Sequence, residues 1–195
     1  MRRRTFDALV SVAGLVLATV LAVAGGLLLW GHSFVDGQVS SQLAAQKIVF
    51  PAANSPAIKA PEFAAMHQYA GQTMTTGAQA EVYADHFIAN HLKEIGGGQT
   101  YAQLSAKALA QPKNAALAAQ VDAMFKGTTL RGMLLNAYAF WKMGQIALWG
   151  AIVSFIGAAS LLVLSALGFV HARRVAPAAE VLVGPAADSP VTTSA

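Results

Sequence analysis

Two long stretches of the chain contain no charged residue, and they set its organisation. The first runs from residue 8 to residue 30 and the second from residue 143 to residue 170. About 20 apolar residues at ~1.5 Å each cross a hydrocarbon core of about 30 Å, so each stretch is long enough for a transmembrane helix. The pattern therefore predicts two transmembrane helices with the segment 31–142 between them.

The intervening segment has the start and stop signals of helices. Thr76 with Gln79, and Thr100 with Gln103, match the capping box that opens a helix. Glycines 96–98 are suited to ending the first of these helices, since glycine tolerates the left-handed cap position. The apolar residues of this helix recur at the spacing of one buried face: Ala84, Phe87, Ile88, His91, Leu92 and Ile95.

The rest of the segment also has helical patterns. Residues 32–47 are expected to extend the first span, and three prolines between residues 50 and 61 indicate a loop. A helix that closes at Gly127 is predicted by Leu117, Val121, Met124 and Phe125, and one continuous helix is expected from Thr128 through the second span. We see no strand alternation, so we expect an all-α domain. Its core should be thin and alanine-rich, and it should depend on the helices that continue the two spans.

Composition supports a membrane protein. Hydrophobic residues make up 55% of the 195 residues and charged residues only 11%, against about 25% charged in a typical soluble domain. The absence of cysteine excludes disulfides and thiolate metal sites. The net charge of +4 comes largely from arginines at the two chain ends, and no basic face alternates with aromatic residues, so we expect no nucleic-acid partner.

The arginines also predict an orientation. Arg2, Arg3 and Arg4 precede the first span, while Arg173 and Arg174 follow the second. Retained basic residues mark the cytoplasmic side. We therefore predict a protein of the cell (cytoplasmic) membrane with a cytoplasmic N-terminus at residues 1–7, an extracytoplasmic helical domain at 31–142, and a cytoplasmic tail at 171–195. The Pro-, Ala-, Ser- and Thr-rich composition of the tail predicts disorder.

A second interpretation of the N-terminus stays open. The arginines, the apolar stretch to about Leu21 and the small residues Ala22, Val23 and Ala24 also fit a cleaved signal peptide. Against cleavage, the apolar run continues and ends in Trp30, which is typical of an interfacial anchor. Tyr138, Trp141 and Lys142 would form the corresponding belt at the second span, with the lysine reaching towards water.

Small residues recur along both spans at a spacing that favours close helix packing. They are Gly14, Ala18, Ala22 and Gly26 in the first span and Gly150, Ser154 and Ala158 in the second. Two interpretations remain open. The two spans pack on each other within one chain, or one stripe faces a second copy (a homo-oligomer) or another membrane protein. Since neither charge-free stretch holds an ionisable residue, a conduction path formed by this chain alone is not expected.

Chemical motifs are weak. His86 and His91 are five positions apart, about 140° around a helix at 100° per residue, so they cannot chelate a metal from one face. His67, His91 and Glu94 are the only metal candidates, and a hydrogen-bonded structural role for His91 is favoured over ligation. Nucleophile elbows and phosphate-binding loops are absent from the sequence. We expect no catalytic residue, no cofactor and no enzyme activity.

Three stretches carry a family resemblance: "MRRRTFDALVSVAGLVLA", "YADHFIANHLKE" and "LRGMLLNAYAFWKMGQIAL". Together they resemble a family of actinobacterial two-span membrane proteins whose function is uncharacterised. The resemblance implies a hairpin of two spans with an external helical domain. Some members carry the name aromatic-ring-opening dioxygenase, but no set of histidines and carboxylates here matches an iron-binding motif.

The leading hypothesis is an integral membrane accessory or scaffold protein without enzyme activity. Its external helical domain would contact a partner in the membrane or the cell envelope. An alternative is an extracytoplasmic ligand-sensing module without an output domain of its own, because the segment after the second span is short. A metal-dependent envelope enzyme using His67, His91 and Glu94 is the least favoured.

Overall fold

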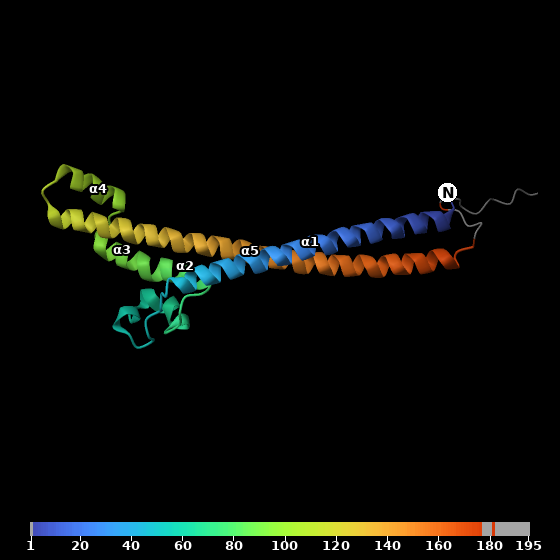
Figure 1. Ribbon diagram of the computed structural model, residues 1–195, viewed down its shortest axis with the longest axis horizontal. Helices are drawn as coiled ribbons and strands as arrows, with labels where there is room; N and C mark the ends of the chain where they lie inside the picture. Colours follow the sequence, from blue (N-terminus) through green and yellow to red (C-terminus); the bar gives the residue numbers. More distant parts are fainter. Residues whose placement is uncertain (1, 177–180, 182–195) are drawn as a thin grey trace, which may run out of the picture. The chain divides into compact units, whose positions relative to one another are not determined.

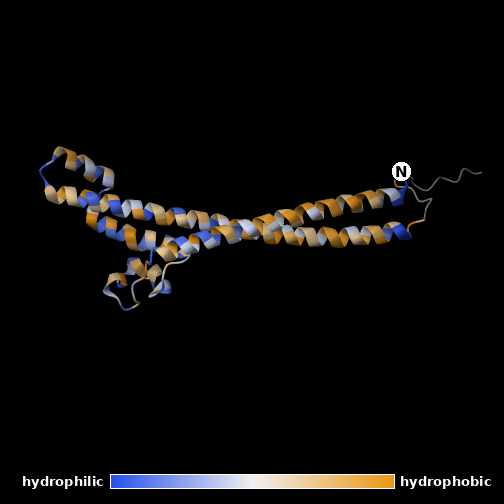
Figure 2. Ribbon diagram, in the orientation of Figure 1, coloured by the Kyte–Doolittle hydropathy of each residue, from blue (hydrophilic) through white to orange (hydrophobic). Residues whose placement is uncertain are grey.

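The computed structural model describes residues 2–176 and residue 181, and the predicted disordered tail lies largely outside these residues. The described chain is all-α, with two long apolar helices flanking a central helical segment. α1 spans Arg3–Ala45 and α5 spans Ala115–Arg174 (Figure 1). Both are long and apolar enough to cross a membrane. Figure 2 shows hydrophobic residues predominating along the first part of α1 and the last part of α5.

The chain forms two units, which are described separately. The first unit contains residues 1–28 and 149–195, and the second contains residues 29–148. These limits fall close to the membrane boundaries at residues 30 and 143 that the sequence predicts. In the first unit α1 and α5 run antiparallel. Asp7 lies opposite His171, with 3.8 Å between Oδ2 and Nε2, and Gly14 lies opposite Ser165.

Small side chains fill the interface of this first unit. The buried positions recur every seven residues on both helices: Ser11, Ala18 and Gly25 on α1, and Ala151, Ala158, Ser165 and Ala172 on α5. A Cβ on Gly14 would come within 2.5 Å of Ser165 Oγ, so the backbones are closer than a larger residue would allow. The large apolar side chains point outwards instead, as Leu9, Val16, Val153 and Leu164 do. A seven-residue spacing keeps one seam of a helix pair in contact over several turns.

The second unit packs short helices against the remaining parts of α1 and α5. They are the 3₁₀ helices η1 (Pro56–Ile58) and η2 (Pro61–Tyr69), the α-helix α2 (Gly77–Val82), the π-helix η3 (Tyr83–Ile88), and the α-helices α3 (Ala89–Gly96) and α4 (Tyr101–Ala110). An isolated β-bridge joins Val49 to Thr73. α2, η3 and α3 follow one another without a break (Figure 1).

Both predicted capping boxes are confirmed. The Thr76 hydroxyl accepts from the backbone N–H of Gln79, and the Gln79 side chain accepts from the backbone N–H of Thr76 in return. Thr100 and Gln103 make the same pair of bonds at the start of α4. Gly97, with φ of 57°, ends α3 in the left-handed conformation, as the glycine run predicted.

The core differs from the thin, alanine-rich core that we expected. Its largest fully buried side chains are Phe50, Ile58, Met66 and Met74, and they come from the proline-rich loop and the segment after it. Ala80 and Ala84 are buried among them. Proline-based 3₁₀ turns fold this segment back over the helices, which brings large side chains inward. The expected dependence on the two long helices is confirmed, because Val39, Leu43 and Leu134 belong to the same core cluster.

Two helix predictions need correction. The helix expected to close at Gly127 continues, because α5 runs unbroken from Ala115 to Arg174. Gly127 instead allows Leu92 to pack closely against α5, since a Cβ there would come within 2.6 Å of Leu92 Cδ2. In the predicted core stripe, Ile95 is exposed, whereas Ala84 and Ile88 are buried. The π-turn that precedes α3 changes the angular spacing of the residues after it, so a stripe counted at 3.6 residues per turn drifts off the core.

Candidate functional site

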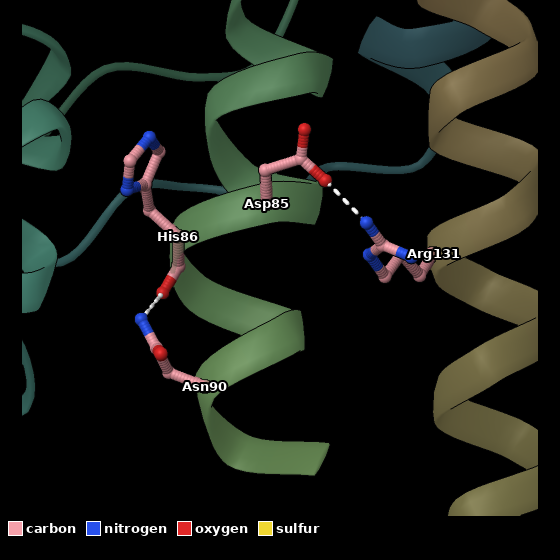
Figure 3. Close-up of polar contacts among 4 residues, drawn as sticks. All are labelled: Asp85, His86, Asn90 and Arg131. Atoms are coloured by element: carbon pink, nitrogen blue, oxygen red, sulfur yellow. Dashed lines mark hydrogen bonds and ion pairs between the residues drawn. The ribbon is translucent and has the colours of Figure 1, made fainter. Parts of the chain in front are cut away.

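The π-helix η3 carries two polar side chains, Asp85 and His86, that contact other elements of the second unit. Ala84 and Ile88 lie in the core, while Asp85 points towards α5 (Figure 3). Asp85 Oδ1 accepts a hydrogen bond from Arg131 Nη2 at 2.6 Å, which joins η3 to α5. Both side chains are about 40% exposed (39% and 41%), so water screens the pair. Such pairs typically contribute about 0–1 kcal/mol.

His86 and Asn90 lie on a different side of the same helix from Asp85 (Figure 3). His86 Nδ1 donates to the carbonyl oxygen of Glu62 at 3.3 Å, which ties η3 to η2. Asn90 Nδ2 donates to the carbonyl oxygen of His86 at 2.7 Å. A π-turn leaves backbone carbonyls less well matched to N–H groups than an α-turn does, so a side-chain amide is a suitable partner there.

The metal candidates are not brought together. His91 packs against Phe87 and Phe63, with ring centroids 4.4 and 5.9 Å away, and its Nδ1 donates to the carbonyl oxygen of Phe87 at 2.7 Å. This is the hydrogen-bonded structural role favoured from the sequence. His67 is exposed on η2 and Glu94 is exposed on α3. Within residues 2–176, no three histidine or carboxylate side chains lie close enough to hold a metal ion.

Two of the predicted interfacial anchors have partners inside the second unit. Trp141 is half-buried and packs against Gly77 at the start of α2, where a Cβ would clash with the indole. Tyr138 stacks on Trp141 with ring centroids 6.2 Å apart. Desolvation by its surroundings, followed by the hydrogen bond and negative charge of Glu81, raises the pKa of Tyr138 above its ordinary value. The other two anchors differ: Trp30 is 68% exposed, and Lys142 is exposed.

The predicted packing residues of the two long helices also divide into two groups. Gly14 and Ala18 lie in the interface of the first unit, as do Gly150, Ser154 and Ala158 on α5. Ala22 and Gly26 are exposed instead, and the Cβ position of Gly26 has no described atom within 4 Å. A four-residue period moves about 40° around the helix at each step, so after Ala18 it leaves the seam that the seven-residue period follows.

An apolar groove of about 600 Å³ lies between α1 and α5 in the second unit. Its floor contains the buried residues Val39, Leu43 and Leu134. Its walls carry exposed large side chains, among them Met133 at 64% and Phe140 at 60% exposure. Four of the lining residues are polar, and all four are amides: Gln38, Gln42, Gln46 and Asn136. No lining residue carries a charge.

No family model, no curated protein and no solved structure matches this chain. The family resemblance given above therefore stays a prediction. The functional interpretation rests on the geometry of the described residues.

Sequence reasoning missed two features. Arg131 is the only arginine away from the chain ends, and this isolation was the available signal for a tertiary partner. The groove had a weaker signal: glutamines at positions 38, 42 and 46 repeat every four residues on one face of a helix. That periodicity shows a shared face, but it does not show that α5 lies beside it.

Proposed function

We propose that the chain is an accessory or scaffold subunit of the cytoplasmic membrane, without enzyme activity of its own. Its helical domain outside the membrane contacts a partner in the membrane or the cell envelope. The spans correspond to the apolar parts of α1 and α5, and the terminal arginines remain in the cytoplasm.

The observation that carries this proposal is the distribution of side chains in the first unit. Small residues are buried in its interface and large apolar residues point outwards. In water this arrangement would expose a continuous apolar surface, which soluble monomers rarely tolerate. In lipid the outward side chains are well solvated, and close contact between small residues holds the helices together. The arrangement therefore favours a bilayer around this unit.

The second unit supports a binding role. Three of its polar side chains are used inside the unit: Asp85 joins Arg131 of α5, His86 joins Glu62 of η2, and His91 bonds the Phe87 carbonyl one turn earlier. Its exposed surface includes the uncharged groove between α1 and α5. Interface cores are typically depleted in charge and enriched in aromatic residues and methionine, as this groove is.

Chemical crosslinking in native membranes, followed by purification in mild detergent and mass spectrometry, tests the proposal. The expected result is recovery only from the detergent-extracted membrane fraction, in a defined complex that crosslinks through residues 29–148. Recovery of the intact chain from the aqueous fraction would refute membrane insertion. A strictly monomeric chain without crosslinks would refute the scaffold role.

A further inference from the structure

The groove between α1 and α5 has a composition that restricts what it binds. An exposed helical surface in water normally carries charges of both signs, and the chain has 22 charged residues (13 basic and 9 acidic). None of those within residues 2–176 lines the groove. A partner with a charged surface would find no complementary charge there, so the groove favours a partner surface that is itself uncharged.

The polar groups of the groove follow one another along its length. Val35 packs against Gly144, and α1 and α5 are antiparallel. Two helical turns farther along α1, Gln42 therefore reaches the level of Asn136 on α5. Apolar side chains line the groove on both sides of this level, with Phe34 and Phe140 towards one end and Met133 towards the other. Gln38 and Gln46 lie about one turn to either side of Gln42, so the groove presents a row of amides among apolar side chains.

From this arrangement we infer that the occupant of the groove is the same face of a second copy of the chain. The inference rests on the membrane placement proposed above. Two copies inserted in one bilayer with the same orientation form a closed dimer only about an axis along the membrane normal. Each residue near that axis then faces its own counterpart at the same height.

Self-pairing of this kind selects residue types. A charged residue would face an identical charge, which is costly. An amide carries both a donor and an acceptor, so two glutamines satisfy each other's hydrogen bonds. Apolar side chains pack on their copies without conflict. The groove contains these two classes alone, and two such faces together form the core of a four-helix bundle.

Cysteine crosslinking tests the pairing directly, because the native chain has no cysteine. Gln42→Cys, oxidised in native membranes, is expected to give a disulfide-linked species of twice the chain mass. Ser41→Cys is the matched control. It is the adjacent residue on α1, it is exposed, and it lies outside the groove. Its yield of dimer should be at least about tenfold lower.

A pair of charge variants gives an independent readout. Gln42→Glu and Gln42→Lys, expressed separately, are each expected to lower the dimer fraction by about tenfold or more through like-charge repulsion. Co-expression of the two variants should restore a dimer that contains one copy of each. Ser41→Glu and Ser41→Lys should leave the native dimer fraction unchanged.

Several outcomes would overturn the inference. They are equal dimer yields from Gln42→Cys and Ser41→Cys, a crosslink from Gln42→Cys to a different polypeptide, failure of co-expression to restore the dimer, and a monomer purified with a lipid in the groove. Each is distinguishable from failure of the membrane proposal, because fractionation measures membrane insertion separately.

Discussion

Individual glycines in α5 have different roles that depend on their neighbours. Gly127 leaves room for Leu92 of α3, whereas the Cβ position of Gly132 has no described atom within 4 Å. Both lie inside the same continuous helix. Glycine in a helix interior is about 1 kcal/mol less favourable than alanine. Only the tertiary contact separates the two positions.

Gly132→Ala is expected to raise the free energy of unfolding by about 1 kcal/mol, through the helix propensity of alanine. The free energy of unfolding of the Gly127→Ala variant should be at least about 1 kcal/mol lower than that of Gly132→Ala, because the added methyl group displaces Leu92. Unfolding of the detergent-solubilised protein, by heat or denaturant, measures both variants. Equal effects would show that Leu92 does not pack on Gly127.

Tyrosine ionisation gives a prediction for alkaline pH. The pKa of Tyr138 is raised from its ordinary value of 10.0 by desolvation and by Glu81, and burial raises the pKa of Tyr83. The folded protein therefore holds these protons more tightly than the unfolded chain. Their stabilising effect is complete below pH 10 and is lost as pH rises through the raised values.

The free energy of unfolding should consequently fall as pH increases above 10. Tyr138→Phe removes one of the two groups, so its stability should fall less steeply over that range. Ultraviolet absorbance of the phenolate, followed against pH in the native protein and the variant, reports the ionisation itself. Identical alkaline slopes of stability in the two proteins would contradict the role of Tyr138.

At the level of secondary-structure elements, the contact between the apolar parts of α1 and α5 depends on register. Ser165 Cβ lies 3.8 Å from the position of a Cβ on Gly14, within the range of about 3.5–4.5 Å that a disulfide requires. Ala22 is on the same helix as Gly14 but is exposed. The two positions therefore distinguish a seven-residue seam from the four-residue stripe.

The double variant Gly14→Cys with Ser165→Cys is expected to form an intramolecular disulfide under a membrane-permeant oxidant. The product migrates differently from the reduced chain on a denaturing gel. Ala22→Cys with Ala158→Cys is the matched control: these positions lie at about the same level, since Leu21 meets Gly157, but Ala22 is exposed, so this pair should remain reduced. A crosslink in the control alone would mean that the helices pack along the other stripe.

For the entire chain, the proposed topology makes a labelling prediction. Gln68→Cys places a thiol on an exposed position of η2, and Thr5→Cys places one near the arginines at the start of α1. A membrane-impermeant maleimide should label Gln68→Cys in intact cells. It should label Thr5→Cys only after the membrane is permeabilised. The reverse pattern would invert the proposed orientation.

Local signals in the sequence were sufficient for several elements. The capping residues Thr76 and Thr100 and the terminating Gly97 have the predicted roles, because a cap forms between residues a few positions apart. Hydrophobic length likewise predicted the two long helices. Each of these features is decided by interactions within one or two turns of chain, so it can be recognised before the fold is known.

Long-range contacts determined the remaining features. Phe50 and Met66 became core residues because turns near prolines fold their segment over α1 and α5. Asp85 pairs with Arg131, which is distant in the sequence, and Gln38 and Gln42 line a groove because α5 lies beside α1. The residue types set what each position tolerates, including glycine for contact and amides for self-pairing. Which positions meet depends on how distant segments pack, and a one-dimensional pattern does not contain that information.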